Sequence, residues 1–155
     1  MEHNDEVISD LKGLINILND GKEGYESASE TTDSIELKGL FLKYSAQRAG
    51  YAMELKDHLA QHGGESENER GGLLGALHRT WIDLKQALSS KEDVSILGSI
   101  ETGEKAAIEK FDAVLDDPAT HADHMELLQK QRTGIREALT EMETYRHRLE
   151  NLNDA

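Results

Sequence analysis

Cysteine is absent from this 155-residue sequence, proline occurs once and aromatic residues make up only 5%. The lack of cysteine excludes disulfides, reactive thiolates and cysteine-bound iron–sulfur clusters. The single proline, Pro118, and the few aromatic residues favour helices over strands, because strands are rich in β-branched and aromatic side chains. We therefore expect an all-α protein, long enough to bury a core without cross-links.

Basic residues are scarce relative to acidic ones. The sequence has 17 Lys and Arg residues and 31 Asp and Glu residues, which gives a formal net charge of -14. Such a charge repels nucleic-acid phosphates and anionic lipid headgroups. No apolar run approaches the roughly 18 residues that a membrane span needs, and residues 1–6 lack the basic and apolar order of a signal peptide. These observations predict no nucleic-acid partner, no membrane association and a cytoplasmic location.

Apolar residues spaced three and four apart predict four long helices. Asp33 and Glu36 form a capping-box pattern at the start of the second helix, Ser90 and Asp93 form one at the start of the third, and Pro118 suits the start of the fourth. A shorter amphipathic stretch around Trp81 predicts an extra short helix between the second and third long ones.

The lengths of the predicted connections define one domain, 1–155, made of two helical hairpins. The expected parts are a first hairpin at 5–62, a crossover with the short helix at 63–90 and a second hairpin at 91–152. Tight turns join the helices within each hairpin, whereas the crossover must travel the length of the molecule. This pattern predicts a ferritin-like antiparallel four-helix bundle.

Three polar residues fall where the helical repeats call for apolar side chains. Arg48, Glu104 and Gln131 lie near mid-height of their predicted helices, and Lys22 and Tyr25 of the first helix project toward the same region. A charge inside a bundle costs several kcal/mol unless it is paired. We expect Arg48 and Glu104 to form a buried ion pair that fixes helix packing; the alternatives are a metal site and capture of a small anionic ligand by Arg48.

A divalent metal ion is the alternative cofactor, and its candidate ligands are the carboxylates of Glu23, Glu54, Glu101 and Glu104. A di-iron bundle uses Glu-x-x-His on two helices, and this sequence contains no such motif. The positive charge of Arg48 would also compete with a dication near Glu104. The prediction is therefore that no cofactor binds.

Histidines occur in two closely spaced pairs at predicted helix ends. The pairs are His58 with His62, and His121 with His124, and either pair could coordinate a divalent metal ion. Solvated histidine is also common near helix ends. We interpret both pairs as surface features, and His78 as a residue that packs the short helix onto the bundle.

Several glycines interrupt the predicted helices, and each costs about 1 kcal/mol relative to alanine. They suggest close helix approach, with Gly24 and Gly103 beside the polar residues, whereas Gly13 and Gly39 fit simple tolerance at exposed positions. The full set is Gly13, Gly21, Gly24, Gly39, Gly50, Gly98, Gly103 and Gly134.

Five stretches together carry a resemblance that spans nearly the whole chain. They are 21–25 (GKEGY), 40–42 followed by Arg48, 63–65 (GGE), 77–85 (LHRTWIDLK) and 101–104 (ETGE). With these stretches the sequence resembles a bacterial family of uncharacterised ferritin-like four-helix-bundle proteins. The resemblance implies a ferritin-like fold, self-association and no established activity. The sequence departs from the family pattern at Gln47, where an acidic residue is common, and at 139–140, where a His-Asp pair is common.

The functional expectation is a non-enzymatic, self-associating accessory or stress-related protein. A homodimer would bury apolar residues of the crossover, such as Leu73, Leu74 and Leu77. The alternative is a ferritin-like protein that binds iron, manganese or zinc through its core carboxylates.

Overall fold

The computed structural model describes residues 2–61, 92–117 and 122–153. Within these ranges the chain forms four α-helices and no strand, which confirms the all-α prediction for this part. The helices are α1 (Glu2–Thr31), α2 (Ile35–Gln61), α4 (Asp93–Leu115) and α5 (Ala122–Asn153). The predicted short helix around Trp81, the cap at Ser90 and the helix start at Pro118 lie outside the described residues.

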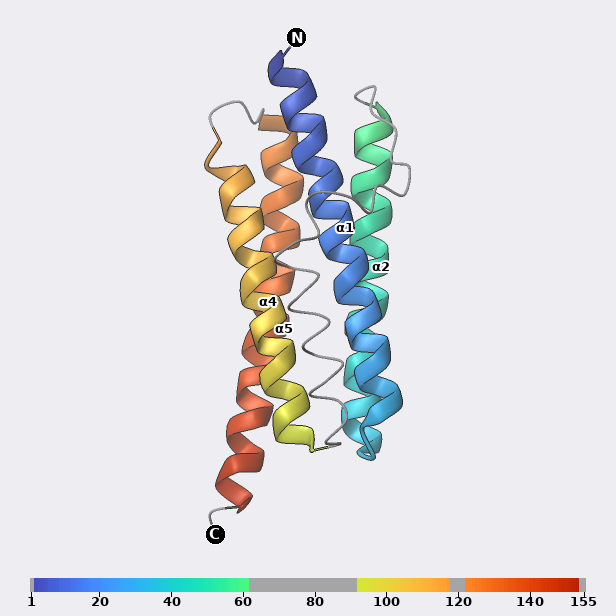
Figure 1. Ribbon diagram of the computed structural model, residues 1–155, viewed down its shortest axis with the longest axis vertical. Helices are drawn as coiled ribbons and strands as arrows, with labels where there is room; N and C mark the ends of the chain where they lie inside the picture. Colours follow the sequence, from blue (N-terminus) through green and yellow to red (C-terminus); the bar gives the residue numbers. More distant parts are fainter. Residues whose placement is uncertain (1, 62–91, 118–121, 154–155) are drawn as a thin grey trace.

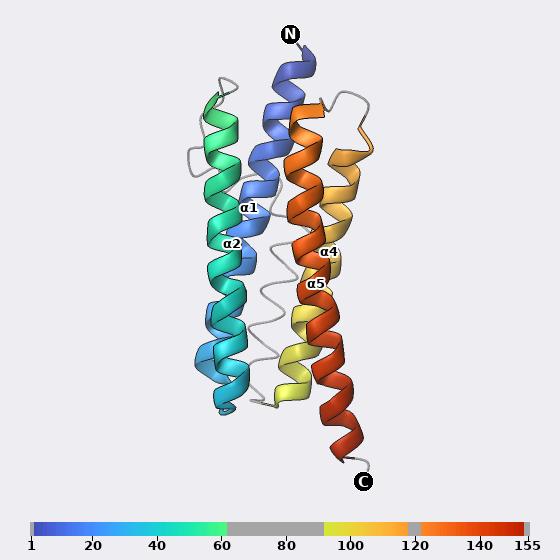
Figure 2. The same cartoon turned by 180° about the vertical axis from the view of Figure 1, so that it is seen from behind.

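The four helices lie side by side along one long axis (Figures 1 and 2). α1 packs against α2 and α4, and α5 packs against α4 and α2, so that α2 and α4 occupy opposite corners. The colours of Figure 1 show α1 and α5 running in one direction and α2 and α4 in the other. The end of α2 and the start of α4 consequently lie at opposite ends of the molecule.

The turn between α1 and α2 uses a different cap from the one predicted. Ser34, not Asp33, occupies the cap position: the Leu37 amide donates to Ser34 Oγ at 3.2 Å, and the Ser34 amide donates to Thr32 Oγ1 at 3.1 Å. Serine and aspartate both accept amide hydrogen bonds at a cap, so two adjacent candidates made the predicted position wrong by one residue. Glu36 therefore lies in the first turn of α2, where the helix dipole favours a carboxylate.

A side-chain hydrogen bond fastens the start of α4 to this turn. The Thr32 hydroxyl donates to Asp93 Oδ1 at 2.7 Å. The residue before α4, Glu92, makes no side-chain cap bond, so Asp93 serves as an anchor between the hairpins.

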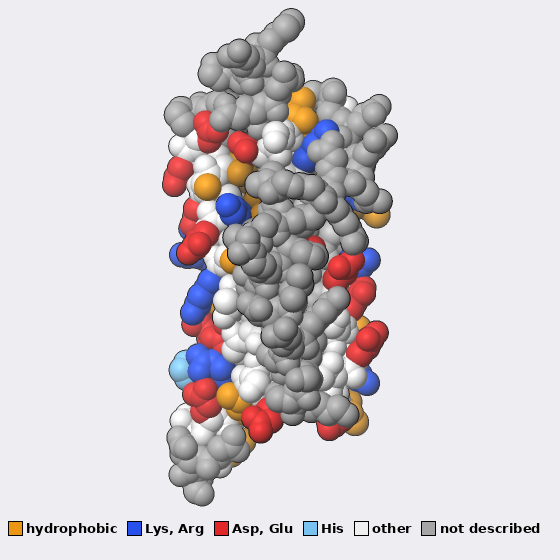
Figure 3. Space-filling model, in the orientation of Figure 1, with side chains coloured by type: hydrophobic (Ala, Val, Ile, Leu, Met, Phe, Trp, Pro, Cys, Tyr) orange, Lys and Arg blue, Asp and Glu red, His pale blue; other side chains and the backbone are white. Residues whose placement is uncertain are grey.

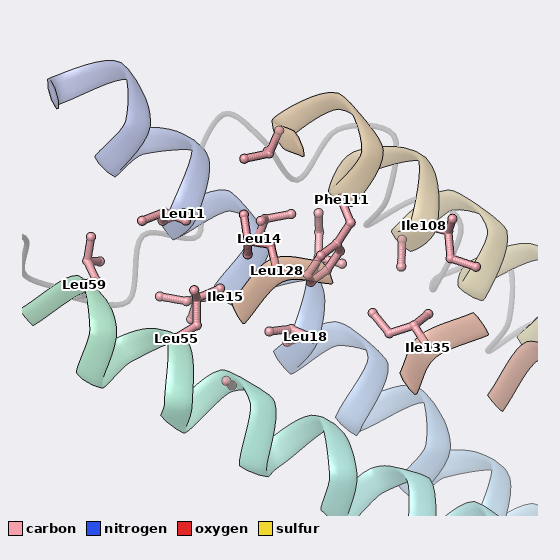
Figure 4. Close-up of a cluster of buried hydrophobic side chains, with 14 of the residues drawn as sticks. Leu11, Leu14, Ile15, Leu18, Leu55, Leu59, Ile108, Phe111, Leu128 and Ile135 are labelled. Atoms are coloured by element: carbon pink, nitrogen blue, oxygen red, sulfur yellow. The ribbon is translucent and has the colours of Figure 1, made fainter. Parts of the chain in front are cut away.

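The apolar core consists of two clusters of buried side chains. The first lies toward the N-terminal end of α1 (Figure 4) and includes Leu11, Leu14, Ile15, Leu18, Leu55, Leu59, Ile108, Phe111, Leu128 and Ile135. The second lies toward the α1–α2 turn and comprises Tyr25, Ala28, Leu37, Phe41, Tyr44, Ile96, Leu97, Ile100, Ala138 and Met142. Nearly all of these positions belong to the predicted inner stripes.

The surface carries charges of both signs. Carboxylates alternate with Lys and Arg side chains along both edges of the face in Figure 3. In the part of the chain that the structure describes, no helix has the length and apolarity needed to cross a membrane.

Candidate functional site

Arg48 lies at the centre of the molecule, between the two apolar clusters. It belongs to α2, one turn from Tyr44 of one cluster and one turn from Ala52 of the other, and only 1% of its surface is exposed. Its Nη1 donates to Glu104 Oε1 at 2.6 Å, Nη2 donates to Glu104 Oε2, and Nε donates to Gln47 Oε1 at 3.2 Å. The planar guanidinium thus makes the two-pronged contact with a carboxylate for which its geometry is suited.

Glu104 is fully buried on α4 and receives a third hydrogen bond from α1. The Tyr25 hydroxyl donates to Glu104 Oε2 at 2.8 Å. The guanidinium carbon of Arg48 also lies 5.5 Å from the centroid of the Tyr25 ring, a cation–π distance. Three helices therefore meet in one network of Tyr25, Arg48 and Glu104, which we call the polar centre.

The protonation states within the polar centre are fixed by its surroundings. Burial raises the pKa of Tyr25 well above its ordinary value, and the negative charge of Glu104 raises it further. Burial lowers the pKa of Arg48, but the charge and hydrogen bonds of Glu104 outweigh this effect and leave the pKa above its ordinary value. Tyr25 is consequently a neutral donor and Arg48 a permanent cation.

Gly21 on α1 provides the space that the guanidinium occupies. A Cβ atom at this position would lie 3.2 Å from Arg48 Nη1 and 3.6 Å from Arg48 Cγ. The sequence analysis predicted close helix approach for the helical glycines as a set, and Gly21 is the member whose added Cβ atom would contact the guanidinium. Gly24 and Gly103, predicted to lie beside the polar residues, are both buried. Spacing alone does not reveal which glycine faces a long side chain on the neighbouring helix.

A second close approach involves Gly134 of α5. A Cβ atom there would lie 1.9 Å from the hydroxyl oxygen of Tyr51, so that any side chain would displace this tyrosine. By contrast, nothing lies within 4 Å of a Cβ atom built on Gly39 or Gly50. Gly39 is exposed, as the interpretation of simple tolerance requires, whereas Gly13 is buried and does not occupy the exposed position expected for it.

Gln131 is fully buried, and its side-chain hydrogen bond goes to the backbone of α2 and not to Arg48 or Glu104. Its Nε2 donates to the Tyr51 carbonyl oxygen at 3.0 Å and so joins α5 to α2. Its Oε1 is buried and has no hydrogen-bond partner among the described residues. This carbonyl lies about one turn beyond Arg48 on α2, and Leu128 and Ile135, which flank Gln131 along α5, belong to the first apolar cluster.

Lys22 does not join the polar centre, contrary to the sequence prediction. Its ammonium lies 3.8 Å from Glu26 Oε1 on the same helix, and both side chains are more than 40% exposed. A long flexible lysine reaches water easily, whereas burial would cost the hydration of its ammonium.

The four candidate metal ligands occupy separate environments. Glu23 is exposed on α1, and Glu54 lies 3.5 Å from Lys130 on the surface. Glu101 binds Arg146 and Glu104 binds Arg48, so each of these two candidate ligands contacts a different arginine. Within residues 2–61, 92–117 and 122–153, no group of three or more His, Asp or Glu side chains is arranged to hold a metal ion.

The Glu101–Arg146 pair was missed by the sequence analysis. Arg146 Nη2 donates to Glu101 Oε1 at 3.1 Å, Nε donates to Glu101 Oε2, and Nη1 donates to Glu150 at 2.7 Å. The side chain of Glu101 is almost fully buried by this contact between α4 and α5. The only sequence signal was the spacing of Arg146 and Glu150, four residues apart on one helix.

The structure corrects the interpretation of two histidines as surface residues. His58 Nε2 of α2 lies 2.5 Å from His124 Nδ1 of α5, and only 4% of the His124 surface is exposed. The partner of each residue therefore comes from the other hairpin. His62, His78 and His121 lie outside the described residues.

Comparison with known proteins relates the chain to one family. Residues 6–117 match the family described as Domain of unknown function (DUF2383). The match includes Tyr25, Arg48 and Glu104, whereas Gln131 and His124 follow it in the sequence. No curated protein matches the chain.

Proposed function

The chain belongs to the DUF2383 domain family, and on this premise we propose that it is a non-enzymatic, self-associating accessory protein of ferritin-like topology. In this proposal the polar centre holds the two hairpins in a single packing arrangement and takes no part in catalysis. A cytoplasmic location, expected from the sequence, is part of the proposal.

The hydrogen bonding of the Glu104 carboxylate is the observation that supports a non-enzymatic role. The fully buried carboxylate accepts two hydrogen bonds from Arg48 and one from Tyr25. A metal ion or a substrate could use this carboxylate only by breaking the ion pair. Removing one partner of a buried pair costs about 3–5 kcal/mol, so the closed arrangement is the stable one.

The position of the pair supports a role in packing specificity. Arg48 lies on the first hairpin and Glu104 on the second, at opposite corners of the bundle. Sliding one hairpin along the other by one residue, about 1.5 Å, would pull the matched donors and acceptors apart. Buried polar pairs fix packing and register in some helical assemblies.

The directions of the helices support the ferritin-like part of the proposal. Each hairpin is antiparallel, and the second helix of the first hairpin runs in the same direction as the first helix of the second. Bundles of this kind require one long crossover between their hairpins.

An outward-facing apolar stripe on α2 supports self-association. The described residues include four large hydrophobic side chains with high exposure, and three of them are on α2: Ile35 (89%), Leu42 (50%) and Met53 (65%). Ala46 and Ala49 continue the line between Leu42 and Met53 with spacings of four, three and four. This is the spacing by which two helices pack in a coiled coil, so we propose the same stripe of a second copy as its partner. The crossover leucines, Leu73, Leu74 and Leu77, lie outside the described residues.

Sedimentation velocity at micromolar concentration tests the self-association. We expect a dimer for the natural chain and a monomer for the variant Leu42→Glu/Met53→Glu. The two introduced carboxylates would have to lose their hydration in the interface, which costs free energy. Leu152→Glu is the matched control, since this leucine is equally exposed but lies on α5. A monomeric natural chain would refute this part of the proposal.

Metal analysis separates this proposal from metal binding by core carboxylates. Protein purified without a histidine tag is compared with its Glu104→Gln and Glu101→Gln variants by elemental analysis. We expect both variants to hold the same metal content as the natural chain. Stoichiometric iron, manganese or zinc that disappears with either carboxylate would favour the alternative.

A further inference from the structure

Two histidine rings converge at the end of the molecule that is remote from the α1–α2 turn. His58 lies in the last turns of α2 and His124 in the first described turn of α5. Their ring planes are almost perpendicular, at 83°, and their centroids are 4.8 Å apart. The rings approach through nitrogen atoms: the distance from His58 Nε2 to His124 Nδ1 is 2.5 Å.

This contact has room for one hydrogen atom between the two nitrogens. One ring must donate and the other must present a bare lone pair, because two N–H groups pointing at each other would repel. A bare imidazole nitrogen is also the commonest metal ligand that proteins offer. When the shared proton moves to the far nitrogen of its own ring, both lone pairs point at one position between α2 and α5.

We propose that His58 Nε2 and His124 Nδ1 bind a first-row transition-metal dication, with Zn²⁺ as its representative, and that water completes the coordination. Zn–N distances of about 2.0–2.1 Å place two ligands of a tetrahedral site roughly 3.3 Å apart. The two nitrogens must therefore separate by about 1 Å from their present distance, which small rotations of both side chains achieve.

The ligand chemistry selects the class of ion. Imidazole nitrogen suits Zn²⁺, Ni²⁺ and Cu²⁺, whereas Mg²⁺ and Ca²⁺ prefer oxygen ligands. Glu54, the candidate metal-binding carboxylate closest to His58 in the sequence, is one turn before it and lies 3.5 Å from Lys130. The site is therefore distinct from the carboxylate site weighed above. The formal net charge of -14 favours the approach of any dication.

The position of the site gives the bound ion a structural role. α2 belongs to the first hairpin and α5 to the second, and they contact each other less extensively than the other neighbouring pairs. The Thr32–Asp93 hydrogen bond joins the hairpins at the opposite end of the molecule. A metal ion bound by His58 and His124 would join the two hairpins at the end of the molecule where this hydrogen bond does not.

Titration calorimetry of the metal-free, untagged chain with Zn²⁺ alone tests the proposal. We expect one Zn²⁺ per chain, an upward shift of the melting temperature on saturation and no such effect with Mg²⁺. His58→Gln should weaken Zn²⁺ binding by more than the roughly 10–100-fold loss that changes to outer-shell partners cause. The control is His147→Gln, because His147 is 63% exposed on α5 and should leave the affinity unchanged.

His124→Gln should have the same effect as His58→Gln, and circular dichroism checks that each metal-free variant is folded. Because His124 is buried and His58 is partly exposed, His58→Gln alone decides the question if the His124 variant fails to fold. Zinc affinity that is unchanged in His58→Gln would overturn the proposal. Affinity lost instead in Glu104→Gln would also overturn it, and would contradict the proposed closed polar centre as well.

Discussion

Arg48 and Glu104 meet head to head at the centre of the bundle although α2 and α4 occupy opposite corners of it. Their side chains are long enough to cross the interior, and Gly21 of α1 leaves the space that the guanidinium needs. Tyr25 closes the third side with its hydroxyl. The charges are thus neutralised by each other and not by solvent, which sets the energetic consequences of any change at this position.

Replacing Arg48 alone should destabilise the fold strongly. Arg48→Met leaves the Glu104 charge buried without its partner, and we expect a loss of roughly 3 kcal/mol or more in the free energy of unfolding. The double variant Arg48→Met/Glu104→Leu should recover much of this loss, because neither charge is then buried. Urea denaturation measures both values.

The matched control for this prediction is Lys130→Met. Lys130 pairs with Glu54 at 3.5 Å, but its side chain is 68% exposed, and such surface pairs contribute about 0–1 kcal/mol. A single Arg48→Met variant as stable as the Lys130 control would show that the central pair contributes nothing.

Gly39→Ala and Gly134→Ala should have opposite effects although both glycines lie inside helices. Nothing contacts a Cβ atom at Gly39, so alanine there should stabilise the chain by about 0.5–1 kcal/mol. A Cβ atom at Gly134 collides with Tyr51, and overpacking of this kind costs about 1–3 kcal/mol. In a Tyr51→Ala background the Gly134→Ala change should lose its cost. Thermal unfolding of Gly39→Ala, Gly134→Ala, Tyr51→Ala and the double variant Tyr51→Ala/Gly134→Ala checks this. Equal effects of Gly39→Ala and Gly134→Ala would contradict the prediction.

The corrected helix cap can be checked by two alanine variants. Ser34→Ala removes the acceptor of the Leu37 amide and should cost about 1 kcal/mol. Asp33→Ala, one residue earlier, should cost clearly less in the same urea denaturation experiment. If Asp33→Ala proves the more damaging change, the originally predicted capping box is the correct one.

Stability should decline at high pH because of tyrosine ionisation. The pKa of Tyr44 is raised from 10 to about 12, mainly by burial and further by the charge and hydrogen bond of Glu141. The unfolded chain releases this proton first, so the contribution is fully present below pH 10 and is lost as the pH rises to about 12.

Urea denaturation at several pH values between 10 and 12 measures the decline. Tyr44→Phe, which cannot ionise, should show a shallower decline than the natural chain. The pKa values of Tyr25, Tyr51 and Tyr145 are also raised, so this variant should keep part of the dependence of stability on pH. An identical slope for both proteins would exclude the assigned pKa of Tyr44.

The helices and their buried faces could be predicted because a three-and-four spacing of apolar residues has one physical solution, an amphipathic helix. The same pattern exposed Arg48 and Glu104 as exceptions, since each interrupts an apolar stripe. The cap of α2 was harder to place, because Asp33 and Ser34 are adjacent and chemically equivalent candidates.

The contacts between hairpins could not be read from spacing. Whether His58 meets His124, or Glu101 meets Arg146, depends on how far one helix is shifted along another, and no local pattern records this shift. Gln131 illustrates the same gap: its height placed it in the polar layer, but the spacing did not show that its amide donates to the Tyr51 carbonyl. Long side chains on different helices have several partners within reach, and tertiary packing selects among them.

The residues at positions 21 and 48 should be coupled in evolution. The guanidinium lies against the bare backbone of α1, so a side chain at position 21 requires the guanidinium to shift by a few tenths of an ångström. A change at position 21 should therefore favour a compensating change at position 48, and loss of Arg48 should favour replacement of Glu104, whose charge would otherwise stay buried without its partner. Sequence changes at the centre of this protein should therefore be coordinated, whereas α2 positions such as Gly39 and Gly50, where an added Cβ atom would meet no described atom within 4 Å, should change independently.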